Sequence, residues 1–204
     1  LIRIHGVTAH SGTPELGENA IFRAAQLLGL VEETHEHTVR CRCHPLVGNA
    51  SLTVTRIHGG HADNVLPGAR ELLLDRRMVP GEDEDAVKKE IQVLLQLAHD
   101  KFGVRSEIIT YKPTTGGATE TDSEDPIVLA GVAACAAQGN PEPGPFGFQG
   151  GCDLVHFRSL GTRGIIIGPG SLAVAHKPDE FIPIDEFVAG SKIYCDVALK
   201  MLKR

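Results

Sequence analysis

The sequence predicts a mixed α/β fold in two parts: a ferredoxin-like β-α-β-β-α-β domain, then the C-terminal part of a second α/β domain. Three observations support this prediction. Strand-like and helix-like patterns alternate in that order over about the first 110 residues, the composition changes at 112–117, and a glycine-bounded apolar run occurs at 164–168. The chain has 204 residues, 42% hydrophobic and 23% charged, which is typical of a globular protein with a buried core.

The first half of the ferredoxin-like pattern is a strand, a helix and a second strand. Residues 1–8 alternate like a strand, which the turn-prone residues 11–14 end. Apolar side chains recur at helical spacing over residues 15–33, and residues 51–58 alternate and are rich in Thr, Val and Ile. The connector between them contains His35, His37, Cys41, Cys43 and His44, in which the two histidine–histidine and cysteine–cysteine pairs are each separated by a single residue. That spacing favours a solvated connector over a zinc site.

The second half repeats the pattern in the order strand, helix, strand. Residues 69–78 form the third predicted strand, which Pro80-Gly81 ends. The acidic residues 82–85 are typical of a first helical turn, and the helix is predicted to continue to Phe102. Residues 104–111 complete the set as the fourth strand.

The remaining residues predict fewer elements and more loop. Residues 112–117 are a linker, and Asp125-Pro126 begins an Ala-rich helix that extends to about Gln138. Residues 141–151 form a Pro/Gly-rich loop. The apolar run at 164–168 predicts a buried parallel strand, and a final helix covers 185–202.

Composition and charge exclude several partners. A net charge of −6 and a pI of about 5.9 argue against nucleic acid or an anionic membrane as partner. The longest apolar run, 127–137, is about half of the ~20 residues that a membrane-spanning helix needs. Five cysteines at irregular spacing favour reduced thiols and a cytoplasmic protein. Because the chain begins at Leu1 within a strand and without a Met, we expect a fragment of a longer protein.

Three segments carry functional signals beyond periodicity. The first contains Ala9-His10-Ser11-Gly12-Thr13-Pro14 and then Gly17-Glu18-Asn19-Ala20. The second contains Gly59-Gly60-His61-Ala62-Asp63-Asn64-Val65-Leu66-Pro67-Gly68 and then Asp75-Arg76-Arg77. The third contains Gly168-Pro169-Gly170-Ser171 and then Ala175-His176-Lys177-Pro178-Asp179-Glu180. Together and in this order they resemble the zinc-dependent amidohydrolase and peptidase family of acetylornithine deacetylase, succinyl-diaminopimelate desuccinylase and the aminoacylases.

The resemblance implies a division of the chain. Residues 1–112 would be the family's lid domain, which is ferredoxin-like and dimerises, and residues 113–204 would be the C-terminal segment of its zinc catalytic domain. The N-terminal catalytic part, which supplies most zinc ligands and the general base, would be absent. A catalytic zinc needs about three protein ligands, so we expect this chain alone to be inactive.

The resemblance also assigns the metal ligand. His176 follows the predicted strand at 164–168, and open α/β sheets bind ligands at the carboxyl ends of their strands. By resemblance it is a ligand of one zinc in a two-metal site, which Co or Mn could also fill. The alternative is a surface histidine beside an acidic loop.

Two further residues have a catalytic role by resemblance. His10 would donate a hydrogen bond to the oxyanion of the tetrahedral intermediate, in the active site of the partner subunit. Asn64 would contact the substrate or the same oxyanion. The alternatives are a helix-entry residue for His10 and a turn residue for Asn64.

Substrate contacts come from two other places. Arg77, in the Asp-x-Arg motif that starts at Asp75, would bind the substrate carboxylate with its guanidinium fork, unless it is an ordinary arginine at a strand end. Gly151, Cys152 and Asp153 match a Gly-Gly-x-Asp loop near the substrate, although many relatives have Thr where this chain has Cys152.

The sequence therefore predicts part of a zinc-dependent hydrolase. It would act on the amide bond of an N-acyl amino acid or small peptide as a cytoplasmic homodimer. A non-catalytic dimerisation module is the alternative, because an exposed edge strand can pair with a second copy.

Overall fold

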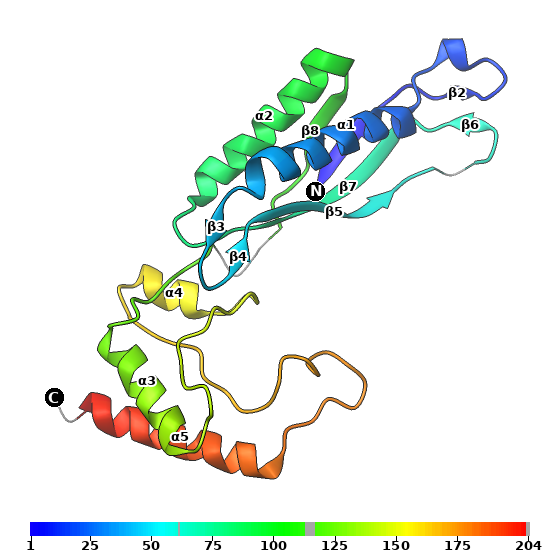
Figure 1. Cartoon of the computed structure of the whole chain (residues 1–204). Coiled ribbons are helices and arrows are strands. Elements are labelled where there is room, and N and C mark those ends of the chain that lie inside the picture. The colour runs from blue at the N-terminus through cyan, green and yellow to red at the C-terminus, as the bar shows by residue number, and fades with distance from the viewer. Residues whose placement is uncertain (61, 113–116, 203–204) are drawn as a thin grey trace. The chain divides into compact units, whose positions relative to one another are not determined.

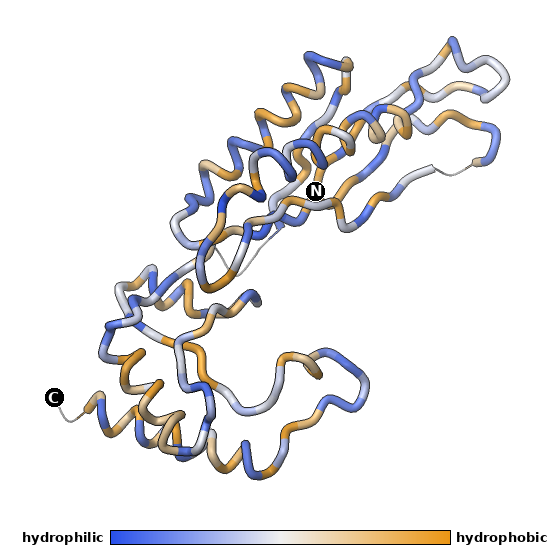
Figure 2. Tube along the Cα trace, viewed as in Figure 1, coloured by the Kyte–Doolittle hydropathy of each residue, from blue (hydrophilic) through white to orange (hydrophobic). Residues whose placement is uncertain are grey.

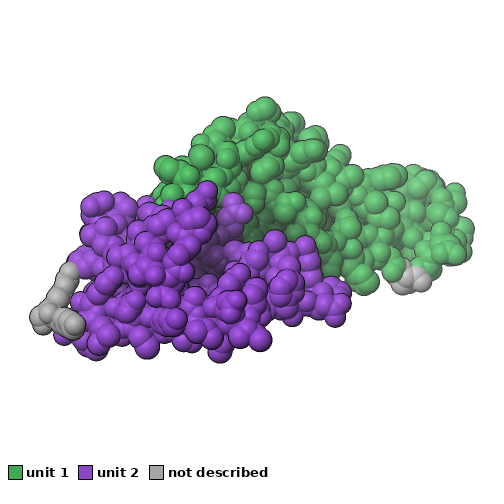
Figure 3. All heavy atoms as spheres, turned by 60° about the horizontal axis from the view of Figure 1, so that its bottom comes forward, with its two compact units in different colours: residues 1–118 green, residues 119–204 purple. Residues whose placement is uncertain are grey.

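A computed structural model describes residues 1–60, 62–112 and 117–202. The chain forms two compact units, residues 1–118 and 119–204 (Figure 3). No helix in the described ranges is both long enough and apolar enough to cross a bilayer.

Unit 1 is built on a four-stranded antiparallel sheet. Its strands are β1 (Ile2–His5), β5 (Ser51–His58), β7 (Ala69–Arg77) and β8 (Arg105–Ile108), in the order β5-β7-β1-β8 (Figure 1). The two central strands are therefore the first and third of the main strands, as in a ferredoxin-like fold. The predicted α+β class of this unit is confirmed.

Two helices pack on one face of this sheet. α1 (Ala20–Thr34) begins after Asn19, whose side chain accepts from the N–H of Ile21, and α2 (Glu84–Phe102) begins after Asp83, whose side chain accepts from the N–H of Ala86. These caps satisfy helix N–H groups that would otherwise lack partners. The core between helices and sheet contains the most deeply buried side chains, Ile4, Leu27, Leu72, Val39 and Val104.

The predicted first strand is interrupted. β1 ends at His5, and a separate short strand, β2 (Ala9–His10), pairs with β6 (Val65–Leu66). The reason is the close crossing at Gly6, where a Cβ would lie 2.2 Å from the carbonyl oxygen of Glu18. Figure 1 shows β2 and β6 projecting beyond the sheet, and we call residues 7–17 and 62–67 the arm.

Two predictions for the neighbouring segments were wrong. The helix expected from Glu15 begins at Ala20, because Pro14–Leu16 form a separate 3-10 turn (η1) and Glu18 bridges to Val7. The expected connector after α1 is partly helical. Residues His35–Val39 form a π-helical turn (η2), and Val39 at its end is 1% exposed and belongs to the core. A small hairpin of β3 (Cys43–His44) and β4 (Gly48–Asn49) follows.

Unit 2 contains three helices and no strand among its described residues. They are α3 (Pro126–Ala137), capped by Asp125, α4 (Leu154–Ser159) and α5 (Ile184–Leu202). α3 packs against α5, and Figure 2 shows apolar residues along both. α4 was not predicted. Most of the predicted linker, residues 113–116, lies outside the described residues.

The strand predicted at 164–168 is absent. This segment runs without regular structure, and residues 165–168 make no backbone–backbone hydrogen bond within the described ranges. Its side chains still pack as expected on one side, because a Cβ at Gly131 of α3 would lie 2.5 Å from Ile165 Cδ1. A strand requires a hydrogen-bonded neighbour, and the described part of unit 2 provides none.

Candidate functional site

The arm brings together two of the predicted site residues. β2 and β6 pair so that His10 is opposite Val65, which places Asn64 beside His10. The N–H of Ser11 donates to the carbonyl oxygen of Asn64 at 2.9 Å. The ring atom His10 Nε2 lies 3.5 Å from Asn64 Nδ2. Two residues 54 positions apart therefore present their polar side-chain ends to the same space.

A backbone contact determines which ring nitrogen of His10 carries the proton. The N–H of Gly12 donates to His10 Nδ1 at 3.0 Å. In a neutral imidazole one nitrogen accepts and the other carries the hydrogen, so the hydrogen of His10 lies on Nε2. In this tautomer Nε2 of His10 and Nδ2 of Asn64, 3.5 Å apart, both carry hydrogens at the same place on the arm.

Both side chains are exposed. Hydrogen-bond donors stabilise a developing negative charge strongly only where water is excluded, because water screens the charge. The His10–Asn64 pair is therefore a preformed pair of donors without the enclosure that an active site needs.

Arg77 lies at the opposite end of unit 1. It is the last residue of β7, whose first residue, Ala69, follows the arm. The nine residues of β7 span roughly 26 Å at about 3.3 Å per residue. Arg77 is 64% exposed, and its Nε donates to Asp75 Oδ1 at 2.8 Å. Within one copy of the chain, the structure does not bring Arg77 to the His10–Asn64 pair.

The other predicted site residues belong to unit 2. Gly151 and Cys152 precede α4, and Asp153 occupies its N-cap position without a side-chain cap hydrogen bond. His176 lies in a loop with a left-handed backbone (φ 60°), and its N–H donates to Glu180 Oε2 at 3.0 Å. Glu180 therefore binds the backbone of this loop at His176. His61, part of the second motif, lies outside the described residues.

The residues present do not fit a complete metal site. No group of three or more His, Cys, Asp or Glu side chains in the described ranges is arranged to hold an ion. That statement covers both His176 and the histidines and cysteines between α1 and β5. Because zinc needs about three protein ligands, His176 can be at most one ligand of a site completed by other residues.

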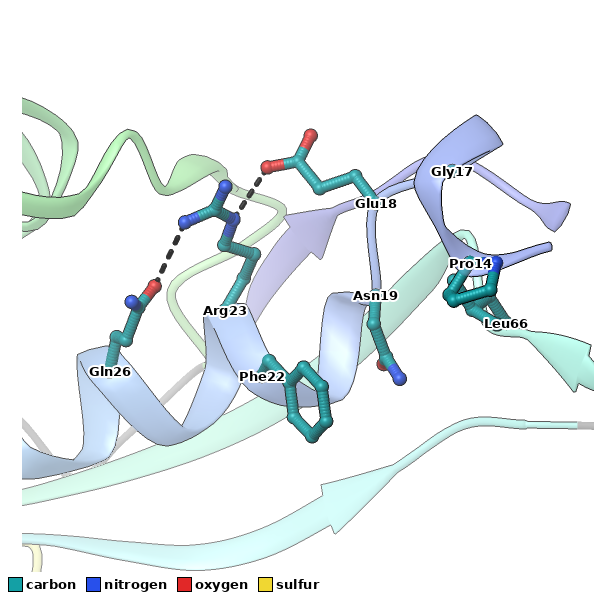
Figure 4. Close-up of a pocket in the computed structure, with 8 residues that line it drawn as sticks. All are labelled: Pro14, Gly17, Glu18, Asn19, Phe22, Arg23, Gln26 and Leu66. Atoms are coloured by element: carbon teal, nitrogen blue, oxygen red, sulfur yellow. Dashed lines mark hydrogen bonds and ion pairs between the residues drawn. The ribbon is translucent and has the colours of Figure 1, made fainter. Parts of the chain in front are cut away.

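Near the arm lies a surface pocket of about 500 Å³. Figure 4 shows Phe22 and Asn19 pointing away from the Arg23 side chain. Arg23 is already bound, since its Nε donates to Glu18 at 2.5 Å and its Nη1 to the carbonyl oxygen of Phe102 at 2.7 Å. None of the predicted site residues lines the pocket, whose lining residues are Pro14, Gly17, Glu18, Asn19, Phe22, Arg23, Gln26 and Leu66.

Sequence reasoning missed two contributions around the site. The first is the hydrogen bond from the Gly12 N–H to His10 Nδ1, which the position of Gly12 two residues after His10 in a turn could have indicated. The second is the ion pair that holds the end of β7 beside Arg77, which the sequence does not indicate. Arg76, its neighbour, is 8% exposed and forms an ion pair with Glu82, which also accepts from the N–H of Val79 at 2.8 Å.

The fold and the site define a class: an α+β domain of ferredoxin-like topology that presents a pair of hydrogen-bond donors on a projecting arm. Residues 1–101 match the family model described as the peptidase dimerisation domain. The chain is 29% identical to acetylornithine deacetylase of Myxococcus xanthus over 191 residues, covering 92% of this chain and 48% of that protein. It is 27% identical to acetylornithine deacetylase of Vibrio parahaemolyticus, covering 90% and 47%.

Solved structures show the same fold. A tripeptidase from Staphylococcus aureus aligns with a TM-score of 0.74 at 18% identity, covering 96% of this chain and 49% of that one. The dipeptidase Dug1p from Saccharomyces cerevisiae aligns with a TM-score of 0.72 at 16% identity, covering 100% and 53%. Residues 1–101 belong to the peptidase dimerisation domain family, and the chain as a whole is similar to acetylornithine deacetylases, in agreement with its motifs. It spans about half the length of the curated relatives it matches.

Proposed function

We propose that this chain is the lid and the C-terminal catalytic segment of a zinc-dependent hydrolase, which cleaves the amide bond of an N-acyl amino acid or small peptide. The names of its relatives, acetylornithine deacetylase and tripeptidase, support this reaction class. The observation that carries the proposal is the convergence of His10 Nε2 and Asn64 Nδ2, two donors 3.5 Å apart.

This pair suits one step of amide hydrolysis. Attack of water on the carbonyl carbon produces a tetrahedral intermediate with a negative oxygen, and donors aimed at that oxygen lower the barrier. His10 is set up as a donor by Gly12, whose N–H occupies Nδ1 and leaves the hydrogen on Nε2. Asn64 offers the second N–H. Neither residue attacks the substrate or removes a proton from water.

The arm supplies these donors to a second copy of the chain. It projects beyond the sheet (Figure 1), and within its own unit it lies at the far end of β7 from Arg77. A homodimer resolves this separation, since the arm of one copy can close over the site of its partner. β5 supports such a dimer because it pairs only with β7 among the described strands and has a free edge. Phe22 on the adjacent helix is 70% exposed.

Substrate recognition is assigned to two further groups. Arg77 binds the carboxylate of the substrate through its guanidinium fork, which Asp75 holds in place at 2.8 Å. Gly151, Cys152 and Asp153 form a loop along the substrate. The Asp153 side chain makes no cap bond at α4 and is available for this contact.

His176 contributes one ligand to the zinc, for which Co or Mn could substitute. One structural relative, Sso-CP2 from Sulfolobus solfataricus, is described as an M20 family metallo-carboxypeptidase, which supports a metal-dependent enzyme. In such a site the metal activates water and polarises the carbonyl. Since the described residues do not complete the site, the role of His176 is limited to this single ligand.

Residues 113–204 are proposed to complete a larger α/β domain. The apolar segment Gly164–Gly168 packs one side against α3 but has no strand neighbour within the described ranges. Unit 2 also exposes large apolar side chains, including Ile184 and Leu202 at 81% each. A parallel strand is normally covered on both faces, so these features suit the edge of a sheet that other strands extend.

All five cysteines are free, which supports a cytoplasmic location.

A dimerisation module without catalysis is the second candidate. It is favoured by the match of residues 1–101 to a domain named for dimerisation and by the free edge of β5. This module would form a dimer through unit 1 and bind no metal. Catalysis distinguishes the two candidates.

The test uses the protein product of the native reading frame that encodes this chain. Hydrolysis of N-acetylornithine, other N-acyl amino acids and dipeptides is measured after dialysis against chelator and addition of zinc, cobalt or manganese. The proposal predicts metal-dependent cleavage of at least one of these substrates. A dimer that cleaves none of them with any metal supports the module instead.

A further inference from the structure

Arg70 stands apart from the other charged residues of the chain. It is the one charged residue classed as buried in the described ranges, with 6% of its surface exposed. Its Nη1 donates to the carbonyl oxygen of Ala69 at 2.9 Å. No carboxylate of the described residues forms an ion pair with it. By contrast, Arg76, which is nearly as buried, has Glu82 as partner.

The surroundings of Arg70 are built from backbone and apolar groups. Its register partner in β1 is Ile4, which is fully buried, so Arg70 points to the helix-covered side of the sheet. The turn after β5 passes over its guanidinium. A Cβ at Gly59 would lie 2.7 Å from Nη1, and a Cβ at Gly60 would lie 3.0 Å from Nη2. Both glycines also have positive φ angles, 143° and 95°.

This arrangement leaves a charge without compensation. Burial lowers the pKa of Arg70, and no neighbouring acid raises it again. A buried cation without a counter-charge is unfavourable in a folded protein, and the one side-chain hydrogen bond that the described residues give this guanidinium is the bond from Nη1 to Ala69. None of its other nitrogens is among the fully buried side-chain atoms without a partner in the described residues, so an oxyanion can reach them and supply the missing charge.

We propose that Arg70 and the Gly59-Gly60 turn form a binding site for a small oxyanion, a carboxylate or a phosphate. The planar fork of an arginine matches two oxygens of either group. The two glycines are required because any side chain there would occupy the space against the guanidinium. This site is separate from the His10–Asn64 pair and does not depend on the proposed hydrolase function.

The site lies next to the segment that leads to the arm. Gly59 and Gly60 begin the segment that joins β5 to β6, and Asn64 lies four residues after Gly60. An anion bound to the Arg70 guanidinium beside this turn therefore lies next to the start of that segment.

The test measures phosphate binding to the full 204-residue chain. Thermal unfolding is followed at increasing inorganic phosphate, with sodium chloride added to keep the ionic strength constant. The variants are Arg70→Met, which keeps an apolar stem of similar length, and the matched control Arg56→Gln on the adjacent strand. We expect a saturable rise in Tm for the wild type and the control, and loss of this rise in Arg70→Met. Acetate in place of phosphate shows whether a carboxylate also binds.

A titration followed by amide NMR keeps the test valid if Arg70→Met does not fold. Phosphate should shift the Gly59 and Gly60 amide signals of the wild type along a saturable curve, while the signal of Gly103, at the end of α2, should stay in place. A wild type without a saturable response to phosphate or acetate would overturn the proposal. An equal rise in Tm for wild type and Arg70→Met, which indicates an adventitious ion only, would overturn it as well.

Discussion

Glu82 holds the end of β7 that carries Arg77, and its replacement by Gln should weaken unit 1 severely. The Glu82 side chain is 9% exposed, and its carboxylate accepts from Arg76, from Arg42 at 2.9 Å and from the Val79 N–H at 2.8 Å. Arg76 is itself 8% exposed. Gln keeps the size and can keep the bond from Val79. It removes the negative charge that both arginines face.

The magnitude follows from this burial. Removing one partner of a buried ion pair typically costs about 3–5 kcal/mol, because the other charge stays buried. Glu90 still lies 3.8 Å from Arg76 and compensates in part. We therefore expect a loss of about 3 kcal/mol. The matched control is Glu84→Gln, two residues away, where an exposed ion pair with Lys88 at 2.9 Å should contribute no more than about 0.5 kcal/mol.

Native-state hydrogen exchange of the core amides of Ile4 and Leu72 measures this difference within unit 1, whatever the stability of unit 2. A loss of about 3 kcal/mol accelerates their exchange by about a hundredfold, since each 1.4 kcal/mol is a factor of ten. Exchange in Glu82→Gln that is no faster than in Glu84→Gln would refute the argument.

Three further results follow from the structure. Burial raises the pKa of Glu82, but its hydrogen bonds to Arg76, Val79 and Arg42 outweigh this effect and lower the pKa below the usual 4.5. Because the pKa is lower in the folded state, ionised Glu82 stabilises the fold above pH 4.5, and this stabilisation is lost at lower pH. In urea unfolding, the difference in stability between wild type and Glu82→Gln should therefore be constant near pH 7 and shrink as the pH falls below about 4. Nitrogen-15 NMR should find the His10 hydrogen on Nε2 in the wild type and a mixture of tautomers in Gly12→Pro, which lacks the donor; an unchanged tautomer in Gly12→Pro would contradict the role of Gly12. The 204-residue chain alone, dialysed with zinc, should retain less than one equivalent and cleave no N-acyl amino acid, and stoichiometric zinc together with cleavage would contradict this.

The main elements of the fold could be predicted because their signals are local. Alternation identified β5, the acidic residues 82–85 marked the start of α2, and the cap Asp125 marked the start of α3. The arm could not be predicted in this way. The break at Gly6 depends on the approach of Glu18, and the pairing of β2 with β6 joins residues more than 50 positions apart. Periodicity contains no information about such contacts.

The apolar run at 164–168 shows the opposite error. Its composition favours a buried strand, but a strand needs a neighbour, and the described part of unit 2 provides none.

The motifs placed His10 and Asn64 in separate segments, and only the structure shows them 3.5 Å apart. Arg70 carried no sequence signal, because its missing counter-charge is visible only once its surroundings are known.

The most direct test of the proposed function is the kinetic effect of His10→Ala in the protein of the native reading frame. Loss of one donor to the oxyanion typically lowers kcat by about 10²–10³. We expect a fall of this size in kcat with a nearly unchanged KM, because the contact forms only in the transition state. An unchanged kcat with a raised KM would show that His10 serves substrate binding alone and would contradict the oxyanion role of the arm.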